Sequence, residues 1–197
     1  MRRSAYNIFC LEGDWYGDLK NPSTVRPVFD LLRQVYPNVN YIYRSIGTPA
    51  EFKHFLGVWK QRRFADYPIL YLAFHGSPGK VHVGDQRRRE GVLSLDEISR
   101  ILGSHCKGRL IHFGACSVLA GDRRHLTRFL ASTGALAISG YRTDIGWMHS
   151  AAFEVFLLMA MQMQKPTRSG AAAVERRVHE MAGKQARELT FRMEVAQ

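Results

Sequence analysis

The chain has 197 residues and a mass of 22.5 kDa, a length that suits one domain able to bury a full hydrophobic core. With 46% hydrophobic and 23% charged residues, it is neither a disordered chain, nor a collagen-like repeat, nor a coiled coil. The formal net charge of +11 favours acidic partners, but the 21 arginines fall in separate short segments, which argues against a nucleic-acid-binding surface.

Strand and helix patterns alternate along the chain. In its first half we expect a strand at 6–11, a helix at 24–35, a strand at 39–43, a helix at 48–59 and a strand at 69–74. In its second half we expect a small hairpin at 81–83 and 92–93, helices at 94–102, 122–130, 149–162 and 169–194, and strands at 110–113 and 135–138. This alternation predicts an α/β fold with an open, mostly parallel sheet and helices on both faces.

The domain organisation follows from the same pattern. We expect a single domain over 1–197, with its core at about 6–162 and a C-terminal helical segment at about 169–194. Three of the expected helices have capping residues at their starts: Ser23 or Thr24 for the first, Ser94 with Glu97 as a capping box, and Asp122. No internal repeat or linker interrupts the chain.

The residues that follow the expected strands point to a site. In an open parallel sheet, the site lies at the carboxyl ends of the strands. His75 and Gly76 follow the buried run at 69–74, and Cys116 follows the buried run at 110–113, 41 residues further along the chain. If these two strands are neighbours, a thiol and an imidazole face each other, which is the minimum set for nucleophilic catalysis by cysteine.

The two segments resemble the signature blocks of the caspase-like (clan CD) cysteine peptidases. These blocks read YLAFHG at 71–76 and LIHFGAC at 110–116, an apolar run that ends in His-Gly and a second one that ends in Ala-Cys. The family includes caspases, metacaspases, separases, gingipains and the bacterial CHAT-type peptidases. The segment SAAFEVFLL at 150–158 looks most like the CHAT-type branch, and the resemblance extends over about 6–162.

The resemblance implies a single caspase-like three-layer domain with cysteine endopeptidase activity on a protein or peptide. Cys116 would be the nucleophile and His75 the general acid and base, while the backbone N–H groups of Gly76 and Cys116 would form the oxyanion hole. We expect Cys116 to precede a helix whose N-terminal amides favour the thiolate. No cofactor or metal is expected, and a regulatory partner protein is compatible with this family.

The residue preceding the cleaved bond (P1) is expected to be basic. Caspases carry glutamine two residues before the nucleophile, and this chain has Gly114 there, so the specificity residues must lie elsewhere. Glu12 and Asp14 follow the first strand, and Asp144 follows the fifth strand beside Arg142. A carboxylate in the pocket would select Lys or Arg, whereas an inward arginine would select Asp. Carboxylates outnumber cations here, so the pattern favours a basic P1 residue.

Other function classes are weaker. A catalytically inactive caspase-like binding module would carry the same fold, and a flavodoxin-like or Rossmann-like nucleotide-binding protein would carry a similar sheet. The glycine motifs that bind phosphates do not follow any expected strand, which argues against the nucleotide-binding alternative. A zinc site would have to use His105, Cys106, His112 and Cys116, whose spacing is not that of paired zinc ligands.

Location and activation can also be predicted. Three cysteines and the absence of a long apolar stretch or a signal-peptide pattern favour a cytoplasmic protein without a membrane segment. The stretch at 121–134 is filled by a helix, so we expect the enzyme to act as an uncut single chain. The polar loop at 84–91, with three arginines at 87–89, is the only segment built like a cleavable loop.

Overall fold

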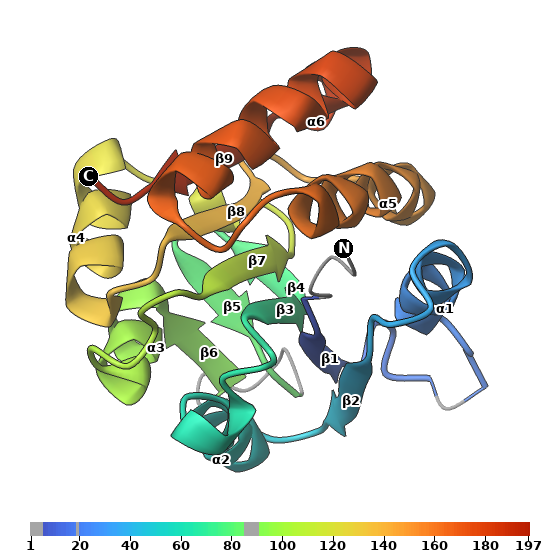
Figure 1. Cartoon of the computed structure of the whole chain (residues 1–197). Helices are drawn as coiled ribbons and strands as arrows, with labels where there is room; N and C mark the ends of the chain where they lie inside the picture. The colour runs from blue at the N-terminus through green and yellow to red at the C-terminus, as the bar shows by residue number, and fades with distance from the viewer. Residues whose placement is uncertain (1–5, 19, 85–90) are drawn as a thin grey trace.

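In the computed structural model, which describes residues 6–18, 20–84 and 91–197, a six-stranded sheet lies between two layers of helices (Figure 1). Across the sheet the order is β2 (Tyr41–Ile46), β1 (Ile8–Gly13), β3 (Ile69–Ala73), β7 (Leu110–Gly114), β8 (Ala137–Tyr141) and β9 (Phe191–Val195). The first five strands are parallel and β9 is antiparallel to β8. The prediction of an open, mostly parallel α/β sheet is therefore confirmed.

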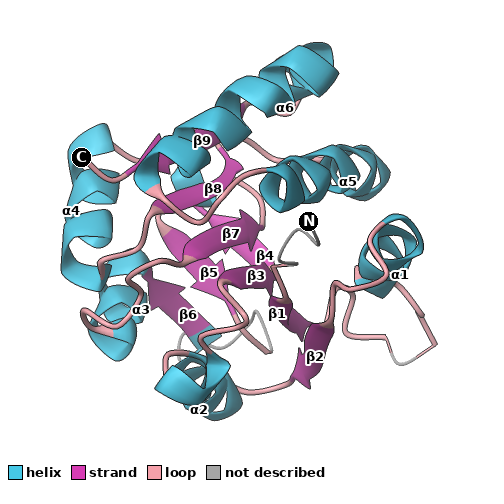
Figure 2. Ribbon diagram, in the orientation of Figure 1, coloured by secondary structure: helices cyan, strands magenta, loops and turns pink. Residues whose placement is uncertain are grey.

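The helices divide between the two faces of the sheet (Figure 2). One face carries α1 (Arg26–Val35), α5 (Trp147–Met163) and α6 (Arg168–Glu188). The other face carries α2 (Pro49–Trp59), α3 (Leu95–Leu102) and α4 (Arg123–Thr133), and η1 (Arg62–Phe64) is a short 3₁₀ turn after α2. Among the described residues, every helix is too short or too polar to cross a membrane.

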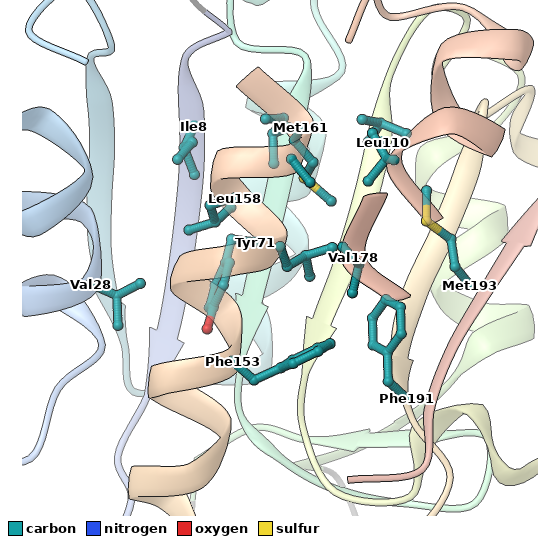
Figure 3. Packing of buried hydrophobic residues seen from close by; sticks show 14 of the residues in the cluster. Ile8, Val28, Tyr71, Leu110, Phe153, Leu158, Met161, Val178, Phe191 and Met193 are labelled. Atoms are coloured by element: carbon teal, nitrogen blue, oxygen red, sulfur yellow. The ribbon is translucent and has the colours of Figure 1, made fainter. Parts of the chain in front are cut away.

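The core is divided by the period-two pattern of the strands. In β1, Ile8 and Cys10 pack on the face covered by α1, α5 and α6, whereas Phe9 and Leu11 pack on the opposite face. On the first face, side chains from the sheet gather with those of α5 and α6, among them Tyr71 (Figure 3). Each fully buried leucine, isoleucine or phenylalanine side chain contributes about 1.5–3 kcal/mol to the free energy of unfolding, so burial stabilises the packing on both faces of the sheet.

Most helix starts follow the sequence prediction. Thr48 and Glu51 form a capping box at α2, in which the backbone N–H of Glu51 donates to the threonine hydroxyl at 3.2 Å. Ser94 and Glu97 form the same box at α3, and the side chain of Asp122 caps α4. A cap of this kind contributes about 1 kcal/mol, so these boundaries are set by local chemistry.

The start of α1 differs from the prediction. Val25 holds the capping position and contributes no side-chain hydrogen bond, but the hydroxyl of Thr24 accepts from the backbone N–H of Arg26 at 3.3 Å. The same hydroxyl donates to a carboxylate oxygen of Glu12 at 2.6 Å, and the backbone N–H of Val25 donates to that carboxylate at 2.8 Å. A buried acid on β1 therefore supports the start of the helix together with Thr24.

The C-terminal prediction of a helix to residue 194 is wrong. The helix α6 ends at Glu188, and Thr190 has a φ of 49°, a left-handed conformation that turns the chain back. Phe191 and Met193 then alternate into the core as β9, which completes the sheet beside β8. Two inward residues at a spacing of two are the signal for a strand, and the helical pattern that precedes them hides it.

A second, three-stranded sheet begins where β3 ends. It consists of β4 (His75–Ser77), β5 (Lys80–His82) and β6 (Val92–Ser94), paired antiparallel. The predicted hairpin is confirmed, but the sequence did not reveal β4, whose first residue is His75. The arginines at 87–89 of the predicted cleavable loop lie outside the described residues.

Candidate active site

Strand register brings His75 and Cys116 to the same level of the sheet. The strands β3 and β7 are parallel neighbours, and Ala73 of β3 pairs with Gly114 of β7. Two residues after this pair, the segment that follows β3 reaches His75 and the segment that follows β7 reaches Cys116. The condition on which the proposed site depends, that these two strands are neighbours, is therefore met.

Gly76 allows the segment after β3 to approach the segment after β7 closely. A Cβ atom at Gly76 would lie 2.4 Å from the carbonyl oxygen of Cys116 and 2.6 Å from a methyl group of Val118. Any side chain at this position would therefore push the segment of the nucleophile away from His75. This contact explains why the block that ends in histidine continues with glycine.

The imidazole of His75 is held by the loop that follows β1. Its Nε2 lies 2.5 Å from the carbonyl oxygen of Trp15, and the indole of Trp15 packs edge-on against the ring with centroids 5.4 Å apart. A carbonyl oxygen only accepts, so Nε2 carries the proton in this contact. In the neutral ring Nδ1 is then the free base, available for proton exchange.

Glu12 is not a substrate-binding residue in this structure, which corrects the sequence prediction. Its side chain is 2% exposed, and its carboxylate accepts four hydrogen bonds. The donors are the indole N–H of Trp15, the hydroxyls of Thr24 and Tyr43, all at 2.6 Å, and the backbone N–H of Val25 at 2.8 Å. Burial, followed by the hydrogen bond to Glu12, raises the pKa of Tyr43 to about 12.

The consequence is a chain of contacts from a buried acid to the candidate base. Glu12 holds the indole of Trp15, and Trp15 holds His75 through both its carbonyl group and its ring. Groups that orient a functional histidine from one residue away commonly control its geometry. The sequence offers one signal for this role, a single acid at the end of a buried strand, and the same signal also fits a group that faces the substrate.

The thiol of Cys116 lies at the junction of two loops. Its Sγ accepts a weak hydrogen bond from the backbone N–H of Ile145 at 3.5 Å, and the side chain is partly exposed. The expected helix after the nucleophile is absent from this described segment: Ser117 has a φ of 58°, and only the 3₁₀ turn η3 (Val118–Ala120) follows before α4. A helix dipole of three residues is too small to favour the thiolate, so that prediction is wrong.

Both dyad residues line one cavity of about 180 Å³. Its walls are Trp15, Tyr16, His75, Gly114, Ala115, Cys116, Ile145, Trp147 and Ser150. The indole N–H of Trp147 is buried and has no acceptor among the residues that the structure describes. An unpaired buried donor costs about 1–3 kcal/mol, so this N–H is an uncompensated polar group in a residue of the cavity wall.

The other residues predicted to bind substrate lie outside this cavity. Asp14 is exposed and accepts from the backbone N–H of Gly17 at 2.9 Å. Asp144 is exposed and accepts from the hydroxyl of Ser117 at 2.9 Å. Arg142 is also exposed. The structure therefore brings together His75, Gly76 and Cys116, but it does not bring Glu12, Asp14, Arg142 or Asp144 into the cavity wall.

A buried polar cluster beneath the site was not found from the sequence. Glu154 of α5 accepts from the hydroxyls of Tyr71 and Tyr141, the latter at 2.9 Å, and lies 3.3 Å from Nε2 of His112. A Cβ atom on Gly114 would lie 3.0 Å from the hydroxyl of Tyr71, so the cluster borders the strand that ends at the nucleophile. Burial raises the pKa of both tyrosines well above the usual value.

The four residues considered for zinc are not brought together as a metal site. His112 is fully buried and bonded to Ser139 at 3.0 Å and to Glu154. Cys106 is buried in the core on the face of the sheet that α2, α3 and α4 cover. Within 6–18, 20–84 and 91–197, no group of three or more histidine, cysteine and acidic residues could hold a metal ion.

The fold defines the class of this protein. The crystal structure of caspase-1 from Spodoptera frugiperda superposes with a TM-score of 0.56 at 14% sequence identity, covering 98% of this chain and 87% of that one. The architecture is therefore caspase-like. The chain itself belongs to a family of unknown function, DUF6642, which matches residues 5–194. No curated protein sequence matches the chain.

Proposed function

We propose that this protein is a cysteine endopeptidase with Cys116 as the nucleophile and His75 as the general acid and base. The observation that carries the proposal is the register of β3 and β7, which ends two neighbouring strands in an imidazole and a thiol that open on one cavity. The caspase-like fold supports a peptidase in general terms. The basic P1 preference has lost its support, because the carboxylates on which it rested lie outside the cavity wall.

The geometry suggests the following acylation step. The Cys116 proton passes to Nδ1 of His75, and the thiolate attacks the carbonyl carbon of the substrate. The backbone N–H groups of Gly76 and Cys116 are the proposed donors to the oxyanion. The imidazolium then returns the proton to the leaving amine as the C–N bond breaks, which leaves a thioester. The carbonyl group of Trp15 stabilises the imidazolium through its bond to Nε2.

Deacylation uses the same groups in reverse. Nδ1 of His75 takes a proton from water, the hydroxide attacks the thioester carbonyl, and the proton restores the thiol as the C–S bond breaks. The products are a carboxylic acid and the free enzyme.

The other two cysteines are poor nucleophiles in comparison. Burial, followed by the charges of Glu12 and Glu154, raises the pKa of Cys10 well above its usual value. Burial also raises the pKa of Cys106 to about 12. Both thiols are therefore protonated at neutral pH and shielded from reagents, whereas Cys116 is partly exposed.

Replacement of the nucleophile tests the proposal. Cys116→Ala should lower the cleavage of a mixed peptide library by about a thousandfold or more, because no other group can form the thioester. Iodoacetamide should label Cys116 faster than Cys10 and Cys106 in the wild-type protein, and His75→Ala should slow this labelling. An unchanged thermal unfolding curve serves as the control for folding. Retained cleavage by Cys116→Ala would contradict the proposal.

Three finer expectations remain predictions. The expected similarity to the CHAT-type branch depends on the segment at 150–158. The expectation of a regulatory partner depends on the family resemblance alone. The expectation that the enzyme works uncut is supported by α4, which occupies Arg123–Thr133. Intact mass of the active protein tests it: a single 22.5 kDa species supports an uncut chain.

A further inference from the structure

The cavity beside the dyad has mostly aromatic and aliphatic walls. Trp15 and Tyr16 contribute from the loop after β1, and Ile145 and Trp147 contribute from the segment between β8 and α5. Because Cys116 also lines the cavity, a peptide whose carbonyl group reached the thiol would place a neighbouring side chain in it. The volume of about 180 Å³ is smaller than the range of about 300–1,000 Å³ typical of clefts for whole ligands, and it suits one side chain.

No carboxylate, lysine or arginine among the described residues lines this cavity. Glu12 is a buried acid behind the wall, whose carboxylate contacts the indole N–H of Trp15 and is already saturated by four donors. A charged side chain that entered the cavity would lose its hydration without gaining a counter-ion. An apolar side chain would lose nothing there and would cover apolar wall.

One wall residue extends this apolar surface to the solvent. Among the described residues, four large hydrophobic side chains are strongly exposed, and Tyr16 at 60% and Met148 at 71% are two of them. Tyr16 is itself part of the wall, and Met148 follows Trp147 in the chain. An exposed aromatic ring in the wall of a cavity is typical of a binding surface.

We propose that this cavity is the S1 pocket and that it selects an uncharged apolar or aromatic P1 side chain. The inference rests on the proposed peptidase function for the name of the subsite, but the chemistry of the walls stands by itself. The main competitor is a basic side chain, since aromatic rings also attract cations. His75 lies in the same wall, and its imidazolium in the reactive ion pair would repel an ammonium or guanidinium group.

Affinity labelling compares the three kinds of side chain. Three peptidyl acyloxymethyl ketones, identical except for Phe, Lys or Asp at P1, are allowed to react with Cys116 and are followed by intact mass. The Phe probe should react at least about tenfold faster than either of the others. A Lys or Asp probe that reacts as fast as the Phe probe would overturn the proposal.

Binding to an inactive variant separates the pocket from the chemistry. Tryptophan fluorescence of Cys116→Ala reports on the cavity, because Trp15 and Trp147 line it while Trp59 is fully buried in the core. Acetyl-Ala-Ala-Phe-amide should bind at least about tenfold more tightly than its Lys counterpart. Such binding supports the pocket even if wild-type Cys116 reacts with none of the three probes, a result that would defeat the proposed peptidase alone. Equal binding of both peptides, or binding of neither, would overturn the pocket.

A matched pair of variants completes the test. Tyr16→Glu places a carboxylate in the wall at a largely exposed position and should shift the Phe-to-Lys labelling ratio towards Lys by about tenfold or more. Leu31→Glu makes the same change at an exposed hydrophobic residue of α1, outside the cavity wall, and should leave the ratio unchanged. Equal shifts in both variants, or no shift in Tyr16→Glu, would overturn the assignment.

Discussion

Two buried carboxylates, Glu12 and Glu154, have the same exposure and different consequences. Each is 2% exposed, and each accepts a hydrogen bond from at least one tyrosine hydroxyl. The donors to Glu12 come mainly from the loop after β1 and the start of α1, whereas those to Glu154 come from β3, β7 and β8. Glu12 therefore orders a loop that touches the dyad, and Glu154 joins α5 to strands that are already ordered.

The comparison teaches that a buried acid can serve the site or the core, depending on what it holds. Glu12 reaches His75 through one residue, Trp15, so a change at Glu12 should alter catalysis more than stability. The cluster around Glu154 includes three strand side chains, so a change there should alter stability first. Variants at both positions test this distinction.

The largest effect is expected for Glu154→Ala. The substitution leaves buried donors on Tyr71, Tyr141 and His112 without their acceptor and should lower the free energy of unfolding by about 3–5 kcal/mol. Urea denaturation measures the change. Glu154→Gln keeps the shape and one acceptor oxygen, so its loss should be smaller. A loss below about 1 kcal/mol for Glu154→Ala would show that the cluster does not stabilise the core.

A smaller loss of stability with a larger loss of rate is expected for Glu12→Gln. The amide cannot accept all four hydrogen bonds, which should cost about 1–3 kcal/mol of unfolding free energy. Displacement of Trp15 should lower kcat by about ten- to a hundredfold with little change in KM, because the base is misplaced while the cavity remains.

Thr24→Val is the matched control for Glu12. It removes one hydrogen bond to the same carboxylate, at 2.6 Å, and the 3.3 Å bond from the backbone N–H of Arg26, and it leaves the bond between Trp15 and Glu12 in place. It should lower stability and leave kcat nearly unchanged. If both variants lower kcat equally, Glu12 acts through general stability and the positioning role is wrong.

The smallest effect is expected at high pH, where the tyrosines that contact the two acids begin to ionise. Tyr43 has its pKa raised from 10.0 to about 12, so the folded state keeps this proton longer than the unfolded state does. Its contribution is fully present below pH 10 and is lost as pH rises through about 12. Tyr43→Phe should therefore make stability less dependent on pH in this window, at a cost of about 1 kcal/mol at neutral pH.

Tyrosinate absorbance distinguishes the two clusters in the same titration. The pKa of Tyr71 and Tyr141 is raised well above 10.0 by complete burial, so these hydroxyls should ionise only as the protein unfolds. The difference spectrum between wild type and Tyr43→Phe should show one tyrosine that ionises before unfolding. Ionisation of Tyr43 at its ordinary pKa would mean that its contact with Glu12 does not persist in solution.

Much of the fold was predictable because local chemistry decides it. The capping boxes at Thr48 and Ser94 start helices through bonds within four residues, and continuous apolar runs at 69–74 and 110–113 indicate strands buried on both faces. β9 was missed because a left-handed residue at Thr190 ends the helix without a glycine or proline to announce it.

For the candidate site, the sequence by itself determined the two blocks that end in His75 and Cys116 and the glycine that lets them approach. These features depend on strand identity and on the absence of a side chain, both of which are local. The tertiary structure alone decided the roles of the carboxylates. Glu12 faces inward because donors from Thr24 and Tyr43, distant in the chain, meet it there, whereas Asp14 remains exposed two residues later. A buried acid is stable only where the fold supplies its donors, and no local pattern records where those donors will be.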